Sequence, residues 1–421
     1  MFYDQIKNYA NNKNPELFLI VITAFSHAFP FLSLLFITVL YTPLDFGVYS
    51  KFYAILFIIL PLSSLKFDKA LLLTNKLEEK KKLLVLSLIS TFSISIIIFL
   101  ATFFLYYFDI WFFDEIGLIM CLILPFSFIQ VGITNVAYYY YNRRGNFYII
   151  GLNRLLRAFF VSILFILLGL YFGNFYGLII ADILGYSLAL TVFVPTKKKL
   201  FSLFKHKKND LLKLAKKFIN FPKYQVFSEI IAKMSENLPT LLFGILYSVA
   251  DQGLVAFALR VFAAPVTLIS GSVGDVFQKR ASDQLIEFGD CSNTFKKTSK
   301  FLFKISIIPF IISLLFLKNA ADLFIDESNE WYEIINVMYI LLPYLFLQFN
   351  VSCLGRMLVI ANKLKLDLVI QIFLLIFLVS GIYAGKYIFD SFNVSLSLFT
   401  FIYCLKYIVE YNYSKRLTTK I

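Results

Sequence analysis

The stretch LPFSFIQ at residues 124–130 lies inside a long apolar segment, and a near copy, LPYLFLQ, fills residues 342–348 of another. A second related pair, LYTPLDFG at 40–47 and LYSVADQG at 246–253, lies at a similar separation. Both pairs occupy equivalent places in the order of apolar segments. Weak internal similarity of this kind is typical of membrane proteins built from a duplicated bundle of helices. The repeats therefore predict two six-helix halves inserted in the same direction.

The composition is that of a protein surrounded by lipid. Of the 421 residues, 59% are hydrophobic and only 16% are charged, and the mean hydropathy is +0.77. A soluble domain does not carry so much apolar sequence. The net charge of +14 would suggest nucleic acid as the partner of a soluble protein. Here the basic residues gather in short loops between apolar segments, so we interpret them as topology signals and expect no nucleic-acid partner.

Twelve segments meet the requirement of about 20 mostly apolar residues for a membrane-crossing helix. Their ranges are 17–41, 46–65, 83–108, 116–141, 148–172, 175–194, 224–247, 253–277, 301–323, 332–356, 368–389 and 394–412. The sequence thus predicts an all-α integral membrane protein with twelve transmembrane helices in two six-helix lobes around a central cavity. The lobes are expected at 1–194 and 224–421. The basic segment 195–223 between them is expected either to lie on the inner leaflet or to form a solvated cytoplasmic linker.

The loops between these spans alternate in charge. One set holds most of the lysines and arginines, including the run from Lys197 to Lys223, and the other is mainly acidic or neutral, as at Asp109 and Glu330. Positively charged loops stay on the cytoplasmic side, so both termini of this multi-pass protein are predicted to be cytoplasmic. The outer loops are short. That disfavours a membrane glycosyltransferase or polymerase with an external catalytic loop, and we expect neither catalytic residues nor enzyme activity.

Metal, disulfide and nucleotide sites are not expected. The four cysteines lack CxxC spacing, three of them lie in apolar segments, and two histidines are too few for a multi-histidine metal centre. The polar N-terminus has no apolar core of a signal peptide, so no cleaved leader is expected. The chain also lacks the glycine-rich phosphate-binding motif of ATPases. We therefore expect no cofactor and no metal.

Several motifs resemble one known group of membrane proteins. FGVYSKFYAI at 46–55 is followed by LKFDKALLL at 65–73, INFPKYQVFSEIIAKMSENLPTLL spans 219–242, and GLVAFALRVFAAPVTLISGSVGDVF spans 253–277. With the six-plus-six spans, they resemble the multidrug/oligosaccharidyl-lipid/polysaccharide exporter superfamily. Within it, they are similar to the polysaccharide biosynthesis family of O-antigen and capsule repeat-unit flippases. The resemblance covers nearly the whole chain.

This resemblance implies a function and a location. The expected protein is a transporter of the bacterial cytoplasmic (inner) membrane that flips an undecaprenyl-diphosphate-linked oligosaccharide from the inner to the outer leaflet by alternating access. Its expected partners are that glycan, membrane lipids and, as candidates, a glycan polymerase and a chain-length regulator. Coupling to H⁺ or Na⁺ is a further expectation.

A diphosphate head group needs cations inside the membrane. The charged residues within the predicted spans supply a candidate set for substrate binding: Lys51, Arg154, Arg157, Lys233 and Arg260. We expect a relay with Arg157 in the inner half, Lys233 near the middle, and Lys51 with Arg260 in the outer half. Gln130 and Gln348, the repeated glutamines, are candidate sugar contacts.

Each candidate also has a purely structural interpretation. Lys51 and Arg260 either line the path or extend to the outer head groups, and Arg154 and Arg157 either line it or extend inward. The two glutamines either contact sugar or join helices. Lys304 and Lys406, near cytoplasmic ends, are expected to be interfacial anchors.

Four residues are candidates for ion coupling: His27, Asp182, Glu229 and Glu236. His27 has an unperturbed pKa near neutrality. Glu229 and Lys233 stand at i,i+4 spacing, so the alternative for them is an ion pair along one helix.

Two rival transport functions stay open. A lipid II-type flippase would differ only in the glycan that it accepts. A drug or metabolite antiporter of the same superfamily should favour acidic cavity residues, whereas cations dominate here.

Overall fold

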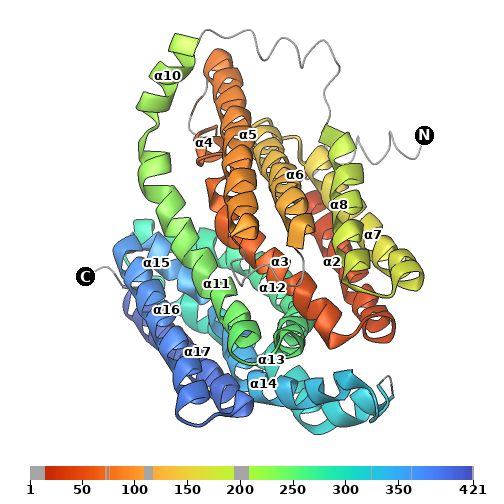
Figure 1. Ribbon diagram of the computed structural model, residues 1–421. Helices are drawn as coiled ribbons and strands as arrows, with labels where there is room; N and C mark the ends of the chain where they lie inside the picture. Colours follow the sequence, from red (N-terminus) through yellow and green to blue (C-terminus); the bar gives the residue numbers. More distant parts are fainter. Residues whose placement is uncertain are drawn as a thin grey trace, which may run out of the picture. The chain divides into compact units, whose positions relative to one another are not determined.

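The computed structural model describes residues 15–71, 74, 76–108, 117–193, 208–323, 325–361 and 363–419 (Figure 1). The polar N-terminus and residues 195–207 of the predicted linker lie outside the described residues. Within the described residues, ten helices are long and apolar enough to cross a membrane. Helices α11 (Val226–Leu246) and α12 (Val249–Glu287) cover the other two predicted spans. The prediction of an all-α membrane protein is confirmed.

The chain divides into two compact units. Unit 1 consists of Met1–Tyr41 and Val48–Asn237, and unit 2 consists of Thr42–Gly47 and Leu238–Ile421. The passage from unit 1 to unit 2 thus falls inside α11, which also contains Pro239. The predicted lobe boundaries at 194 and 224 describe the sequence repeat, and they stay a prediction.

Unit 1 contains the long helices of the first half, apart from residues 43–47, which belong to unit 2. They are α2 (Pro15–Leu40), α3 (Pro43–Ile59), α5 (Leu77–Tyr107), α6 (Gly117–Arg143), α7 (Phe147–Phe172) and α8 (Phe175–Leu190). Helix α7 packs against both α2 and α8 (Figure 1). The approach of α7 and α8 requires glycine at Gly185, because a Cβ there would lie 2.3 Å from Cγ2 of Val161. Small residues bring helices together in this way inside membranes.

Short elements join these helices at the ends that the charge pattern assigns to the cytoplasm. The 3₁₀ turn η1 (Leu60–Leu62) follows α3 and leads to the short helix α4 (Phe67–Ala70). The 3₁₀ turn η3 (Thr191–Phe193) ends α8. Helix α10 (Lys208–Lys217) comes next among the described elements, and the π-helical turn η4 (Phe221–Gln225) leads into α11.

Helix α10 is the described part of the predicted linker, and it packs on unit 1. Leu214 is buried in a cluster with Phe67, Leu71 and Leu83. Two ion pairs accompany this contact, from Lys82 to Asp210 at 2.9 Å and from Lys217 to Glu79 at 3.0 Å. The amphipathic pattern of α10 therefore covers an apolar face of the protein itself.

Unit 2 holds the remaining helices. They are α12, α13 (Ser292–Asp322), η5 (Glu330–Glu333), α14 (Ile334–Val351), η6 (Leu354–Arg356), α15 (Met357–Ile360), α16 (Leu364–Tyr387) and α17 (Phe392–Arg416). Its core joins Phe277, Phe295, Leu302 and Met357. Lys406, expected as an anchor, is instead 13% exposed and pairs with Glu410 at 2.5 Å on α17.

The second sequence repeat marks two equivalent helix starts. Thr42 caps α3, because its hydroxyl accepts from the N–H of Asp45 at 3.2 Å while the Asp45 carboxylate accepts from Thr42 N at 3.1 Å. Ser248 caps α12, because its hydroxyl accepts from Asp251 N at 3.0 Å and donates to the Asp251 carboxylate at 2.6 Å. Such caps satisfy backbone donors that the first helical turn leaves unpaired. The repeated aspartates are therefore explained by capping.

Candidate functional site

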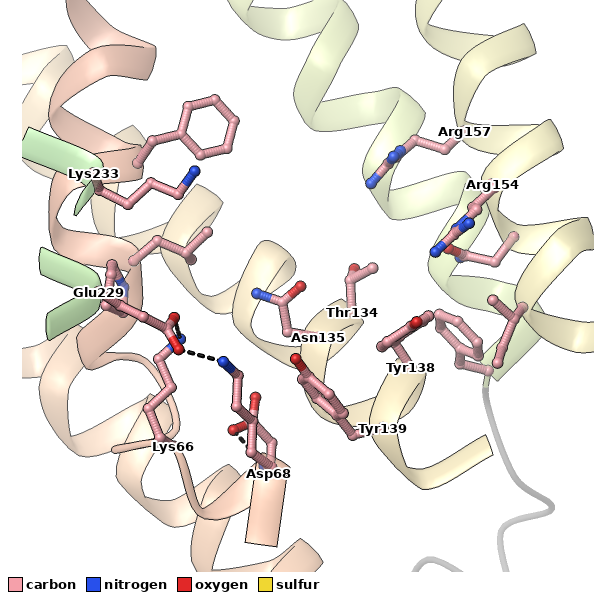
Figure 2. A pocket seen from close by; sticks show the side chains of 17 residues that line it. Lys66, Asp68, Thr134, Asn135, Tyr138, Tyr139, Arg154, Arg157, Glu229 and Lys233 are labelled. Atoms are coloured by element: carbon pink, nitrogen blue, oxygen red, sulfur yellow. Dashed lines mark hydrogen bonds and ion pairs between the residues drawn. The ribbon is translucent and has the colours of Figure 1, made fainter. Parts of the chain in front are cut away.

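A cavity of about 470 Å³ lies within unit 1 (Figure 2). Residues from the end of α3, the α4 turn, α6, α7 and the first turns of α11 line it. Five of the lining side chains are basic, and two are acidic. By the predicted topology, all these helix ends belong to the cytoplasmic half of the membrane.

The α4 turn contributes one wall of the cavity. The turn reverses the chain through two left-handed residues, Leu65 with φ of 48° and Lys66 with φ of 61°. Non-glycine residues adopt this conformation only when the surrounding structure holds them there, and functional sites often contain them. The turn brings Lys66 and Lys69 to face Glu229 on α11.

Glu229 pairs with both of these lysines. Its Oε2 lies 2.6 Å from Nζ of Lys66, and its Oε1 pairs with Nζ of Lys69. Figure 2 shows Glu229 and Lys66 together at one side of the cavity. The i,i+4 pair between Glu229 and Lys233 that the sequence suggested is therefore replaced by contacts across the fold. Lys233 pairs with Glu236 at 2.5 Å instead.

Asp68 lies beneath this ion cluster and is almost fully buried, at 2% exposure. Its Oδ1 accepts a hydrogen bond of 2.8 Å from the backbone N–H of Lys69. Burial raises the pKa of the Asp68 carboxyl, and the neighbouring charge of Lys66 and the Lys69 N–H offset part of that rise. Asp68 therefore fastens the turn that carries the two lysines.

The opposite wall comes from α7. Arg154 and Arg157 stand one helical turn apart, and Figure 2 shows both guanidinium groups directed into the cavity. Arg154 donates to Oγ1 of Thr23 at 3.0 Å, and Arg157 donates to the Tyr186 hydroxyl at 3.4 Å. These neutral partners orient the guanidinium groups without neutralising them.

Local sequence fixes the register of α7. Asn146 caps the helix with its side-chain oxygen, which accepts from the N–H of Ile149 at 3.4 Å. One turn before Arg157, Asn153 is buried and donates from Nδ2 to the carbonyl of Ala189 at 2.7 Å. Asparagine 153 thus holds α7 against the end of α8 and sets the rotation that turns both arginines toward the cavity.

Between the walls, α6 presents polar and aromatic side chains. Thr134, Asn135, Tyr138 and Tyr139 line the cavity (Figure 2). The ring of Tyr138 lies 5.3 Å from the Arg154 guanidinium carbon, in cation–π range. Hydroxyl, amide and aromatic groups suit the hydroxyls and apolar faces of sugars, whereas the flanking cations suit phosphate.

The cavity thus brings together four residues of the predicted site, namely Arg154, Arg157, Lys233 and Glu229. The inner and middle steps of the expected relay therefore share one space. Lys51 on α3 and Arg260 on α12 are not among its lining residues. Arg260 lies 5.9 Å from the ring centre of Phe46 in unit 2. Their roles at the outer steps stay predictions.

The repeated glutamines lie elsewhere. Gln130 is buried, and its Nε2 donates to the carbonyl of Ile183 at 3.1 Å and to Oγ of Ser187 at 2.5 Å. These contacts join α6 to α8. Gln348 is half-buried on α14 in unit 2. Sugar contact by either glutamine stays a prediction.

The candidates for ion coupling are spread over unit 1. Asp182 on α8 is buried and accepts hydrogen bonds from Tyr49, at 2.5 Å, and from Tyr53. His27 is half-buried on α2, one turn beyond Thr23, the partner of Arg154. Glu236 is exposed beside Lys233. No group of three or more His, Cys, Asp and Glu side chains gathers as a metal would require in the parts of the chain that the structure describes.

The site residues predicted from the sequence did not include three of the seven charged lining residues, Lys66, Asp68 and Lys69. The lining side chains of α6 were not predicted either. The motif LKFDKALLL at 65–73 carried the available signal, because a basic–acidic–basic pattern directly after a span is costly to bury without a purpose.

Solved structures share this fold. The lipid II flippase MurJ in an inward closed conformation is 15% identical, with a TM-score of 0.72 over 95% of this chain and 88% of that chain. An inward-facing multidrug resistance MATE transporter of the MOP superfamily is 14% identical, with a TM-score of 0.62 over 95% and 94%. A MOP superfamily transporter from Pyrococcus furiosus is 15% identical, with a TM-score of 0.57 over 95% of both chains. These neighbours are transporters and a flippase rather than enzymes, and the likeness confirms the predicted transporter fold.

Sequence comparison supplies the family. None of the curated protein sequences matches this chain significantly. Residues 37–335 match the family model described as polysaccharide biosynthesis protein. The match extends over well more than half of the 421 residues. The resemblance first carried by the motifs at 46–55, 65–73 and 219–242 is thereby confirmed. The chain belongs to the polysaccharide biosynthesis protein family of membrane transport proteins.

Proposed function

We propose that this protein flips an undecaprenyl-diphosphate-linked oligosaccharide, of the O-antigen or capsule type, from the inner to the outer leaflet. One observation carries the proposal: Arg154, Arg157 and Lys233 face the same 470 Å³ cavity as Lys66 and Lys69. A diphosphate crossing about 30 Å of hydrocarbon needs such partners. The isoprenoid tail can stay in lipid while the head group occupies the cavity.

The chemistry of the cavity fits both parts of that head group. Guanidinium groups bind phosphate oxygens through two parallel hydrogen bonds, and ammonium groups act as mobile point charges. Tyr138, Tyr139 and Asn135 lie between the cationic walls. They are placed to contact the first sugars while the cations hold the diphosphate.

The rest of the transport cycle belongs to the same proposal. Alternating access would pass the head group from this cavity toward Lys51 and Arg260, with both termini in the cytoplasm of a bacterial cell. Asp182 and His27 are the candidates for H⁺ or Na⁺ coupling. A glycan polymerase and a chain-length regulator would receive the exported unit.

A lipid II-type substrate is the second candidate. The fold shared with the lipid II flippase MurJ favours it, and its diphosphate makes the same demand on the cavity. An antiporter for cationic compounds is disfavoured, because five basic side chains face two acidic ones here.

Neutralising the cavity tests the proposal. Arg154→Gln, Arg157→Gln and Lys233→Gln should each lower surface glycan and raise lipid-linked repeat units in the cytoplasmic leaflet, at matched protein levels. Loss of a charge-assisted hydrogen bond costs about 1.5–3 kcal/mol, which corresponds to roughly a tenfold to hundredfold weaker interaction. Lys223→Gln, at an exposed lysine outside the cavity, is the matched control. Normal surface glycan in all three cavity variants would refute the function. Export of lipid II alone would select the second candidate.

A further inference from the structure

Two of the five cavity cations share one carboxylate of the protein. Glu229 uses both oxygens, one for Lys66 at 2.6 Å and the other for Lys69. The side chains of Lys66 and Lys69 are 10% and 26% exposed, and that of Glu229 is 29% exposed. The carboxylate is therefore reachable from the cavity, Lys69 is about as exposed as the carboxylate, and Lys66 is the most enclosed of the three.

We propose that Glu229 is an exchangeable counter-ion, which occupies the anion subsite formed by Lys66 and Lys69 until the substrate diphosphate takes its place. This inference rests on the proposed function. It assigns to Lys66 and Lys69 the binding of phosphate oxygens, and to Glu229 the role of an internal competitor.

The electrostatics favour this exchange. A diphosphate carries more negative charge than one carboxylate, so it gains more from two converging ammonium groups at the same distance. As it enters, it also repels Glu229. In the absence of substrate, the carboxylate prevents Lys66 and Lys69 from standing unpaired in a poorly solvated turn, which would be costly.

The two acidic residues of the cavity have different roles: Asp68 holds the α4 turn in place, and Glu229 acts as the counter-ion that can leave. Asp68 is 2% exposed and is bonded to the backbone of its own turn at Lys69. It cannot leave without unfolding that turn. Glu229 comes from another helix, is considerably more exposed, and in the described part of the chain contacts the turn through the two lysines. Only Glu229 is therefore free to exchange.

Exchange would change how α11 is attached. Glu229 lies in the first turn of α11, directly after the π-helical turn Phe221–Gln225. The same helix carries the chain from unit 1 into unit 2 after Asn237. When the diphosphate replaces Glu229, the ionic tie between the α4 turn and α11 is lost. Substrate binding thereby loosens the helix through which the chain leaves unit 1, and a ligand shifts a conformational equilibrium by such a difference in contacts.

If Glu229 competes with the substrate, removing its charge should raise the affinity of the protein for diphosphate. Removing one partner of a merely structural ion pair should not. Glu229→Gln in the full-length protein in lipid nanodiscs should bind inorganic pyrophosphate and a short-chain isoprenyl diphosphate at least about fivefold more tightly than wild type, within the usual range of coupling between ligands. Glu78→Gln is the control, because Glu78 pairs with Lys81 along α5 and neither residue lines the cavity. Lys66→Gln/Lys69→Gln should weaken binding, and adding Glu229→Gln to it should then change nothing.

A thermal measurement guards against misfolding. Glu229→Gln should melt at a lower temperature than wild type without ligand, and pyrophosphate should raise its melting temperature by more than it raises that of wild type, because the ligand supplies the missing counter-ion. Glu229→Asp, whose carboxylate is withdrawn by one methylene, should show the same trend more weakly. Unchanged or weaker diphosphate binding by Glu229→Gln would overturn the inference, as would a melting-temperature loss that pyrophosphate does not restore.

Inorganic pyrophosphate and the isoprenyl diphosphate also distinguish a failure of this inference from a failure of the proposed function. If neither diphosphate binds wild type, or if Arg154→Gln/Arg157→Gln binds both as well as wild type does, the proposed function fails. If those controls behave as expected and only Glu229→Gln does not tighten binding, the counter-ion exchange fails alone. Tightening confined to inorganic pyrophosphate would assign the subsite to soluble anions and overturn its assignment to the lipid-linked substrate.

Discussion

Gly47 in α3 and Gly253 in α12 make reciprocal backbone contacts within unit 2. A Cβ at Gly47 would lie 1.9 Å from the carbonyl oxygen of Val249, and a Cβ at Gly253 would lie 1.9 Å from that of Pro43. Each glycine meets the first residue of the other helix. When each of two equivalent residues contacts the other's helix at the same position, the two helices are related by two-fold symmetry. The repeated glycine therefore allows a symmetric crossing of α3 and α12.

Alanine at either glycine should therefore push the two helices apart. We expect Gly47→Ala and Gly253→Ala each to lower the free energy of unfolding by about 1–3 kcal/mol, the usual cost of overpacking. Thermal unfolding in detergent checks this. Gly145→Asn is the control, because a Cβ there has nothing within 4 Å and asparagine tolerates its φ of 69°. Equal melting of all three variants would contradict the expectation.

The buried carboxylate of Asp182 should depend on its tyrosine donors. Tyr49→Phe removes the 2.5 Å hydrogen bond, and we expect it to cost about 1–3 kcal/mol of stability. Asp182→Asn should reduce the further cost of Tyr49→Phe, because a neutral amide needs the donor less. A double-mutant cycle of unfolding measures this coupling, and strict additivity would show that the two groups do not interact.

The Lys406–Glu410 pair should matter far more than a surface pair of the same spacing. Both side chains are nearly buried, at 13% and 11% exposure, so Lys406→Met leaves a buried carboxylate unpaired and should destabilise unit 2 by about 3–5 kcal/mol. Lys386 and Asp390 are also an i,i+4 pair but are 32% and 81% exposed. Lys386→Met should cost less than about 1 kcal/mol. Comparable losses in the two variants would argue against a buried pair.

The buried Asp68 gives stability a predictable pH dependence. Its folded pKa is raised above the ordinary 3.8 by burial, so the folded protein holds this proton to higher pH than the unfolded chain does. The resulting stabilisation is complete below pH 3.8 and is lost as pH rises through the raised pKa. Asp68→Asn should remove that slope in melting curves.

Asp290 supplies a control of opposite sign. Hydrogen bonds from the backbone N–H and the hydroxyl of Ser292 lower the pKa of this exposed carboxyl. The stability that Asp290 contributes to the folded protein is therefore present above pH 3.8 and is lost as pH falls through the lowered pKa. Asp290→Asn should change the acid side of the same melting curves, and a parallel response of the two variants would contradict both assignments.

The predicted topology can be tested on exposed positions. Single cysteines at 326 and 213, both exposed, are introduced into a background without the four native cysteines. An impermeant thiol reagent outside the cell should label position 326, whereas position 213 should require access from the cytoplasm. Labelling of both positions from one side would refute the twelve-span arrangement.

Local signals in the sequence predicted the helices, whereas the partners of their charged side chains could not be read in advance. Apolar length marks a span, because it depends on neighbours in the chain. The Thr42–Asp45 and Ser248–Asp251 caps are also local, although the repeat that contains them was used only to predict the duplication. Glu229 instead meets Lys69 from 160 positions away, while Lys233 at the right spacing pairs elsewhere. Lys406 likewise resembled an anchor until tertiary packing enclosed it. Hydropathy indicates that a helix as a whole lies in lipid, but it does not indicate which face of the helix packs against which neighbouring helix.

The cavity of unit 1 draws its walls from chain segments before and after residues 194–207. A chain cut in that interval would yield one fragment with both cavity arginines and another with Glu229 and Lys233. Neither fragment alone would carry the complete set of anion-binding groups. Co-expression of the two fragments would then serve as a complementation assay with glycan export as its readout. Recovered export would show that the first turns of α11 pack beside α4 without a covalent link between the fragments.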